Sequence, residues 1–265
     1  MNIKKHIPNA ITCGNLLCGC LAIVKAFEGD LVWAAYLVGI AAVLDFFDGF
    51  AARMLKVSSP IGKDLDSLAD MVTFGVVPGI VMFHLIKITV SIHNFEGCVG
   101  CEFPGHYNPE SPLEKNLPYF AFLIPVFSAI RLAVFNNDTR QSESFIGLPT
   151  PANAIFICSL PLIISFSDGM VGSIFVSEGS RIVHQYWTLI PITIINSFLL
   201  NAPLPLFALK FKHFKWKENE IRFVFLGLCL VMLITLQFLG IPLIIIMYIL
   251  LSVINNTLLK KKVVS

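Results

Sequence analysis

Four aspartates, Asp45, Asp48, Asp66 and Asp70, stand at helical spacing inside apolar sequence. The first two are three residues apart and the last two are four apart, so each pair lies on one face of its helix. An ionised carboxylate in hydrocarbon costs roughly 2.5–3.5 kcal/mol on insertion scales and requires a compensating partner. Carboxylate oxygens suit magnesium, manganese or calcium rather than zinc or copper. The pattern therefore predicts shared cations, since two divalent ions would neutralise four aspartates and could clamp a diphosphate during a displacement.

Long apolar helices must carry these carboxylates. The chain has 265 residues, of which 56% are hydrophobic and 14% charged, whereas soluble domains carry about 25% charged residues. Eight apolar segments are long enough to span a bilayer at about 20 residues each. The predicted spans lie near 8–28, 32–54, 67–92, 117–136, 151–167, 186–206, 221–238 and 240–258. A short loop between the second and third spans makes these two helices antiparallel, so the two aspartate pairs face each other.

The predicted fold is therefore all-α, a polytopic transmembrane helical bundle. We expect one integral-membrane domain over residues 1–265, with a catalytic core in 1–165 that contains the aspartate motif at 45–70. Residues 166–265 are expected to add C-terminal spans.

The distribution of cations predicts the orientation of the bundle. With the N-terminus in the cytoplasm, most of the 19 Lys and Arg fall on that side, while the other side receives Lys115 and Arg181. Both termini and the aspartate site are then cytoplasmic, where a water-soluble substrate and a lipid can meet. The net charge of +2 is too small to argue for nucleic acid. The chain lacks organelle-targeting features, so we expect a bacterial inner membrane.

Residues beside the aspartates bear on the chemistry. Gly49 removes a side chain next to the carboxylate face, so a bulky or charged group can approach the backbone. Arg53 can grip a phosphate oxygen or simply extend to the membrane surface. Lys63 borders the same site, or is an ordinary cytoplasmic charge. A cation transporter would also explain intramembrane carboxylates, but it would not explain a glycine and an arginine at these places.

The motif Asp-x-x-Asp-Gly-x-x-Ala-Arg, eight residues, Gly-x-x-x-Asp-x-x-x-Asp resembles the signature of the CDP-alcohol phosphotransferases. Its positions are Asp45, Asp48, Gly49, Ala52, Arg53, Gly62, Asp66 and Asp70. The resemblance implies two divalent cations, Mg²⁺ or Mn²⁺, bound by the four aspartates, with Asp70 as the general base. It also implies cytidine nucleotide contacts around Gly49, Ala52, Arg53 and Gly62, and a homodimer.

The first predicted span adds polar residues to this set. Asn9, Thr12 and Asn15 are predicted to contact the nucleotide diphosphate, because polar groups on one face of a spanning helix usually have partners.

Further segments resemble the phosphatidylserine synthase branch of the family, over roughly the first two-thirds of the chain. They include Thr73-Phe-Gly75, the segment around Arg131, and Gly147-Leu-Pro-Thr150. The resemblance implies phosphatidyl transfer from CDP-diacylglycerol to the hydroxyl of L-serine, which releases CMP and forms phosphatidylserine.

The acceptor site is predicted from the chemistry of serine. Arg131 can bind the serine carboxylate in a fork, or it can lie at the membrane interface without a ligand. Asn136 and Thr150 are weaker candidates for serine binding. Glycerol 3-phosphate and inositol are alternative acceptors. A phosphate-bearing acceptor would require further cations near Arg131, and the adjacent sequence has none.

Two polar segments lie apart from this chemistry. Cys98 and Cys101 favour a local disulfide over a metal site in the predicted outer loop. Residues 210–217 alternate cations with aromatics, which indicates either the headgroup layer or a solvated loop.

Overall fold

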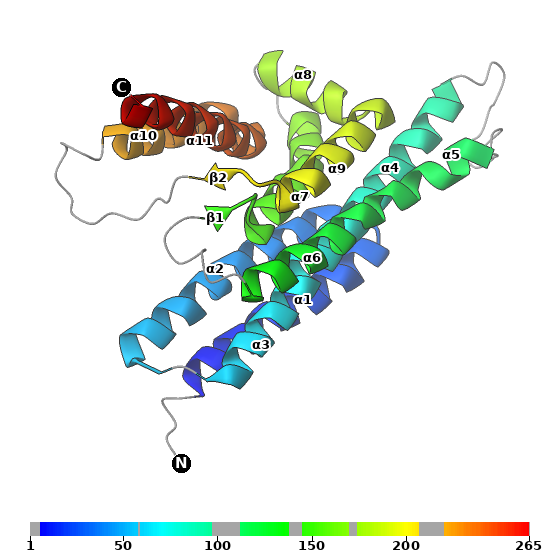
Figure 1. The fold of residues 1–265 in the computed structure, drawn as a ribbon. Coiled ribbons are helices and arrows are strands. Elements are labelled where there is room, and N and C mark those ends of the chain that lie inside the picture. Colours follow the sequence, from blue (N-terminus) through cyan, green and yellow to red (C-terminus); the bar gives the residue numbers. More distant parts are fainter. Residues whose placement is uncertain are drawn as a thin grey trace.

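The protein is a bundle of helices in a computed structural model, which describes residues 6–57, 59–96, 112–137, 145–169, 174–206 and 220–264. The long helices run side by side along the bundle, and the C-terminal pair of helices lies to one side of it (Figure 1). The helices are α1 (Ile7–Phe27), α2 (Leu31–Leu55), α3 (Pro60–Asp70), η2 (Met71–Val76), α4 (Val77–Glu96), α5 (Pro112–Asn116), η3 (Leu117–Phe122), α6 (Leu123–Asn137), α7 (Thr150–Gly169), α8 (Ile174–Val183), α9 (Tyr186–Asn201), α10 (Glu220–Leu236), η5 (Gln237–Leu239) and α11 (Gly240–Val264). The all-α prediction is confirmed. Among the described residues the only strands are β1 (Phe145–Ile146) and β2 (Pro205–Leu206), which form one short antiparallel pair.

Helices α1 and α2 form the tightest pair in the bundle, because small residues line their interface. Ala22 and Ala26 of α1 and Ala34 and Ala41 of α2 are fully buried. Small side chains let two helix backbones approach closely, which replaces the hydrophobic driving force that is absent between helices in lipid. At the other end of α2, the hydrogen bond from Thr12 to Asp48 joins the part that carries the aspartates to α1.

The third predicted span begins earlier than predicted. We expected it near residue 67, but α3 starts at Pro60 and runs without a break through η2 into α4. Ser59 caps it by accepting a hydrogen bond from the backbone N–H of Gly62 at 3.0 Å, and proline suits the first helical turn. Gly62 therefore lies on a helix rather than in the loop.

Between α3 and α4 the chain forms the π-helix η2, which packs against α1. The Thr73 hydroxyl donates to the backbone carbonyl of Asn15 at 3.3 Å. A Cβ on Gly19 would collide with Thr73, so glycine is needed at this crossing. Contacts from η2 thus hold the end of α3 that carries Asp70 next to α1.

The second half of the bundle differs from the prediction in two places. The sixth predicted span, 186–206, ends as a helix at Asn201, because Pro203 and Pro205 cannot continue it. The additional helix α8 precedes this span. The last two predicted spans form a hairpin of α10 and α11, which turns at Gln237 with a φ of 52°.

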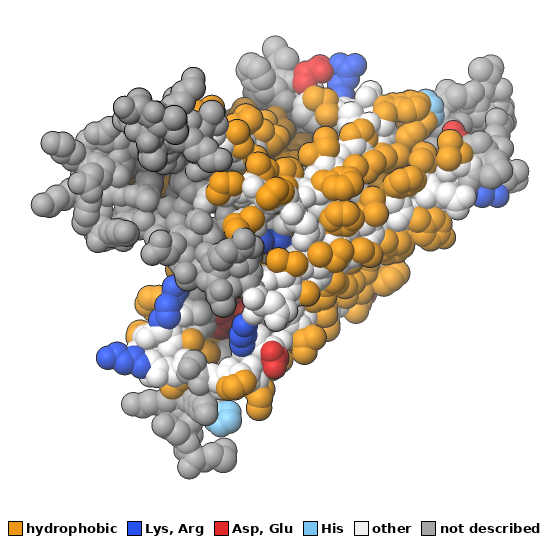
Figure 2. Space-filling model, viewed as in Figure 1, with side chains coloured by type: hydrophobic (Ala, Val, Ile, Leu, Met, Phe, Trp, Pro, Cys, Tyr) orange, Lys and Arg blue, Asp and Glu red, His pale blue; other side chains and the backbone are white. Residues whose placement is uncertain are grey.

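The surface identifies the bundle as integral to a membrane. Five helices in the described parts of the chain are long and apolar enough to cross, namely Ile7–Phe27, Leu31–Leu55, Pro60–His93, Leu113–Asn137 and Phe223–Ile254. Thr150–Phe166 and Tyr186–Asn201 are apolar but shorter. Figure 2 shows hydrophobic side chains covering the middle of the long helices, with charged groups near the ends. The predicted count of eight spans is not established by these lengths, and Cys98, Cys101 and residues 210–217 lie outside the described residues.

Candidate active site

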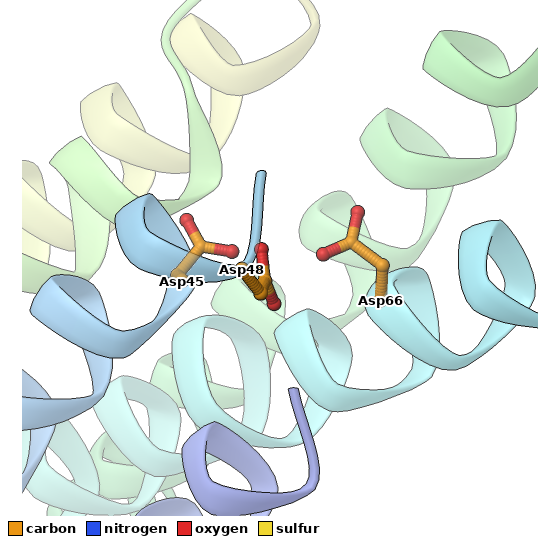
Figure 3. Close-up of side chains that lie close together, drawn as sticks. All are labelled: Asp45, Asp48 and Asp66. Atoms are coloured by element: carbon orange, nitrogen blue, oxygen red, sulfur yellow. The ribbon is translucent and has the colours of Figure 1, made fainter. Parts of the chain in front are cut away.

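Three of the four predicted metal ligands meet between α2 and α3. Each of Asp45, Asp48 and Asp66 offers a carboxylate oxygen, and these oxygens all lie within 4.8 Å of one another. Asp45 and Asp48 lie side by side on α2, and Asp66 faces them from α3 (Figure 3). The predicted antiparallel arrangement of the two helices therefore produces the predicted cluster.

The fourth aspartate, Asp70, lies deeper in the bundle. Its side chain is buried and interacts with that of Asp45. The side-chain amide of Asn15 donates to one oxygen of Asp70 at 3.4 Å, so α1 contributes to its environment. Asp70 thus adjoins the cluster of three without belonging to it.

Helix α1 also orients the cluster through Thr12. The Thr12 hydroxyl is 2.7 Å from Oδ2 of Asp48 and 3.1 Å from the backbone carbonyl of Pro8. Both side chains are buried, so this hydrogen bond restricts the rotation of the Asp48 carboxylate. Thr12 was predicted as a diphosphate contact, and the structure gives it a bond to a predicted metal ligand.

A pocket of about 280 Å³ opens beside the cluster. It is lined by Pro8, Asn9, Thr12, Asp48, Gly49, Ala52, Val57, Ser59, Gly62, Lys63 and Asp66. A Cβ at Gly49 would meet no atom within 4 Å, whereas a Cβ at Gly62 would lie 2.9 Å from Oδ1 of Asn9. The first glycine leaves the pocket open, and the second lets α3 approach α1.

Several predicted site residues point elsewhere. Arg53 donates from Nε to the carbonyl of Gly49 at 3.0 Å and is exposed, and neither it nor Asn15 lines the pocket.

The predicted serine contacts also lie away from the pocket. Buried Arg131 donates to backbone carbonyls of Ile146, Gly147 and Leu148. The structure does not bring Arg131, Asn136 or Thr150 to the pocket wall, so their contacts with serine stay predictions.

Sequence reasoning left Pro8, Val57 and Ser59 out of the predicted site, although all three line the pocket. Ser59 was recognisable as a helix cap, because it precedes Pro60 at the start of an amphipathic segment. Lys63 had two possible explanations, a place beside the site or an ordinary cytoplasmic charge, and the structure places it on the pocket wall.

The donor set fits a hard divalent cation. Three carboxylates, two of them on the pocket wall, supply oxygen ligands from two helices, and the described cluster contains neither sulfur nor imidazole. Such a set suits Mg²⁺, Mn²⁺ or Ca²⁺. The aspartate cluster can therefore hold a metal ion at the mouth of a pocket large enough for part of a nucleotide.

The comparison with protein families distinguishes an enzyme from a cation transporter at this site. The model of the CDP-alcohol phosphatidyltransferases matches residues 5–199, which include all four aspartates and the whole pocket wall. The chain belongs to the CDP-alcohol phosphatidyltransferase family. The family match continues beyond residue 165, where we placed the end of the catalytic core, and covers most of α9.

Curated members of the family are similar to this chain at moderate identity. The CDP-diacylglycerol–serine O-phosphatidyltransferase of Bacillus subtilis is 33% identical over 150 residues, which are 55% of this chain and 70% of that protein. The enzyme of the same name from Helicobacter pylori is 31% identical over 175 residues, 64% of each chain. The archaetidylserine synthase of Methanothermobacter thermautotrophicus is 28% identical over 176 residues, 63% of this chain and 65% of that protein.

Thr12→Val is expected to weaken metal-dependent activity in this family member without unfolding it. Valine has nearly the shape of threonine but cannot donate to Asp48, and loss of such a contact to a ligand typically costs about 10- to 100-fold in metal affinity or activity. The measurement is the half-saturating Mn²⁺ concentration for CMP release. Thr235→Val is the matched control, because the Thr235 hydroxyl donates to the carbonyl of Val231 within α10, far along the chain from the site. An equal response of the two variants would contradict a role for the Thr12–Asp48 bond.

Proposed function

We propose that this protein transfers a phosphatidyl group from CDP-diacylglycerol to the hydroxyl of L-serine, releasing CMP and forming phosphatidylserine. The observation that carries this proposal is the meeting of Asp45, Asp48 and Asp66 at a pocket lined by Gly49, Ala52 and Gly62. The relatives support the acceptor, because serine stands in the names of all three. A cation transporter is not favoured, since it gives no reason for the glycine-lined pocket or for the family match.

The aspartates would hold two divalent ions, Mg²⁺ or Mn²⁺, with Asp45, Asp48, Asp66 and Asp70 as ligands. When bound, these ions neutralise the diphosphate and the departing phosphate. Asp48 and Asp66 line the pocket itself, which suits contact with the diphosphate, and Thr12 keeps the Asp48 carboxylate oriented. Our proposal of two ions also rests on charge, because two divalent cations balance four carboxylates.

The remaining residues of the pocket would bind the nucleotide. Gly49 and Ala52 present almost no side chain, so the cytidine can lie against α2, and Asn9 offers a polar group from α1. Gly62 brings α3 close enough to close the opposite wall. Asn15 would act next to Asp70. Arg53 would reach a phosphate from the open side, after leaving its bond to the Gly49 carbonyl.

Asp70 would serve as the general base. It takes the proton of the serine hydroxyl as that oxygen attacks the phosphorus bonded to diacylglycerol. The new oxygen–phosphorus bond replaces the bond to CMP, which leaves with the electron pair. Most of the rate enhancement would come from orientation and electrostatic stabilisation in the pocket. For serine we retain Arg131 as the proposed contact of the carboxylate, with Asn136 and Thr150 as weaker candidates for serine binding.

The setting of the reaction is also part of the proposal. The cation distribution supports an active site and both termini on the cytoplasmic side of a bacterial inner membrane. The acyl chains of the donor would then remain in the cytoplasmic leaflet while the headgroup enters the pocket. We further propose a homodimer, as the family resemblance implies, with residues 166–265 adding spans to the core.

Purified protein in detergent with CDP-diacylglycerol and Mn²⁺ is expected to release CMP when L-serine is supplied. Glycerol 3-phosphate and inositol, each supplied in place of serine, should release CMP no faster than buffer does. Asp70→Asn should abolish the release with serine, because an amide cannot accept the proton. Release with one of the other acceptors would keep the mechanism but overturn serine as the substrate. Folded protein that releases no CMP with any acceptor would contradict the enzymatic proposal.

A further inference from the structure

A ring of three hydrogen bonds joins α3 to the C-terminal end of α6. Lys63 donates from Nζ to the backbone carbonyl of Asn136 at 2.9 Å, and the Asn136 amide donates to Oγ of Ser67 at 2.8 Å. The Ser67 hydroxyl in turn donates to the backbone carbonyl of Lys63 at 3.2 Å. Asn136 is separated from Ser67 by 69 residues in the chain, so this ring fixes the relative position of two distant segments.

At this end α3 approaches α1 closely at Gly62, but burial of apolar side chains adds little to hold its position. Of its 11 residues, only Ala69 and Asp70, both at the far end, are buried, whereas Ile61 and Leu68 are 73% and 65% exposed. Apolar packing therefore fixes α3 near Asp70 but does less around Asp66. The ring of hydrogen bonds acts on this weakly packed stretch, directly beside Asp66 in the sequence.

We propose that Asn136 is a positioning residue, which ties α3 to α6 so that Asp66 stays within metal-binding distance of Asp45 and Asp48. The cluster depends on two helices, because α2 supplies two carboxylates and α3 supplies the third. Ligands must stay within about 0.5 Å of their productive positions to bind a metal well. A small displacement of α3 would therefore lower metal affinity without disturbing the pocket wall on α1 and α2.

The adjacent Asn137 provides a matched comparison. It donates from Nδ2 to the carbonyl of Ala133 at 2.9 Å, within its own helix, and is exposed. The two asparagines thus have the same chemistry and neighbouring positions but different partners. Lys63 is unsuited to the test, because it also lines the pocket and its loss would affect ligand binding directly.

The experiment is a titration of purified protein in detergent with Mn²⁺, followed by electron paramagnetic resonance without any substrate. Asn136→Ala and Ser67→Ala should each raise the dissociation constant for Mn²⁺ about tenfold. Their combination should raise it no further than either alone, since both remove the same hydrogen bond. Asn137→Ala should bind Mn²⁺ like the unchanged protein. Thermal unfolding of each variant shows that the protein is folded.

Each other outcome has a distinct meaning, because the inference rests on the metal site of the proposed function. Unchanged protein that binds no Mn²⁺ would overturn that metal site and this proposal together. Mn²⁺ binding that is equal in Asn136→Ala and the unchanged protein would overturn this proposal alone, even if the variant unfolds at a lower temperature. A raised KM for serine in Asn136→Ala with unaltered Mn²⁺ binding would instead assign Asn136 to the acceptor site.

Discussion

Asp66→Asn is expected to lower kcat for CMP release at least about thousandfold, which corresponds to about 4 kcal/mol of lost transition-state stabilisation. The amide has the size of the carboxylate but lacks its charge, and Asp66 is the only member of the cluster of three that α3 contributes. Without it, the oxygens of Asp45 and Asp48 face an uncharged group across the gap between the helices. The measurement is single-turnover release of CMP at saturating serine over a range of Mn²⁺ concentrations.

Asp64→Asn is the matched control for this prediction. Asp64 lies two residues before Asp66 on the same helix, is exposed, and does not line the pocket. It should retain activity within about twofold, because a solvated carboxylate outside the site makes little difference to charge stabilisation within it. If Asp64→Asn lost as much activity as Asp66→Asn, the total charge of α3 would matter rather than the cluster.

Gly49→Leu should strongly weaken nucleotide binding while leaving the fold intact. The space beside Gly49 is empty in the structure, since an added Cβ would meet no atom within 4 Å. That space belongs to the pocket, so a leucine side chain would occupy volume that the nucleotide requires. We expect kcat/KM for CDP-diacylglycerol to fall at least about 100-fold, or about 2.7 kcal/mol.

Gly39→Leu distinguishes occlusion of the pocket from a general effect of leucine in this helix. Gly39 lies on the same helix α2, and a Cβ there would likewise meet nothing within 4 Å, but it does not line the pocket. Both substitutions replace a helical glycine with a better helix former, which favours the fold by up to about 1 kcal/mol. The prediction fails if the two variants lose activity equally, or if Gly49→Leu keeps its KM for CDP-diacylglycerol.

The cluster was predictable from the sequence because it depends on local periodicity. Spacings of three and four residues put each aspartate pair on one face, and a short connection between apolar helices leaves little choice about which faces meet. Asp45, Asp48 and Asp66 accordingly come together as predicted. The family resemblance implied nucleotide contacts at Gly49, Ala52 and Gly62, and the polar residues of the first span added Asn9 and Thr12. All five line the pocket, whereas Arg53 and Asn15, predicted with them, do not.

Contacts between distant segments were not predictable in this way. The bonds of Arg131 to the carbonyls of residues 146–148 and the bond of Asn136 to Ser67 depend on how α6 packs against the rest of the bundle. Periodicity gives the face of a helix on which a residue lies but not the partner that this face meets. Arg131 was predicted to bind the serine carboxylate and Asn136 was a weaker candidate for serine binding, and the structure gives both of them partners within the protein.

Fold prediction succeeded for helices and was less accurate at their ends. Apolar length identifies a spanning helix, because the bilayer imposes the same length on each. Where a helix stops depends on local chemistry, such as the Ser59 cap that starts α3 early and the prolines after Asn201 that end α9. The pairing of β1 with β2 joins segments about 60 residues apart and has no signature in two-residue strands.

The π-helix η2 between Asp70 and Val77 sets the rotation of the carboxylates about the helix axis. A wider turn of this kind accommodates an additional residue, and each residue of an α-helix turns the chain by about 100°. The half of the long helix that carries Asp66 and Asp70 is therefore rotated, about the helix axis, from the direction that an uninterrupted α-helix of the same residues would give it. The number of residues in each turn of 71–76 thus determines the direction in which the face with Asp66 and Asp70 points. If residues 71–76 wound as an ordinary α-helix instead, both carboxylates would turn by about a quarter of a circle relative to the half that crosses the membrane, although every aspartate would still be present.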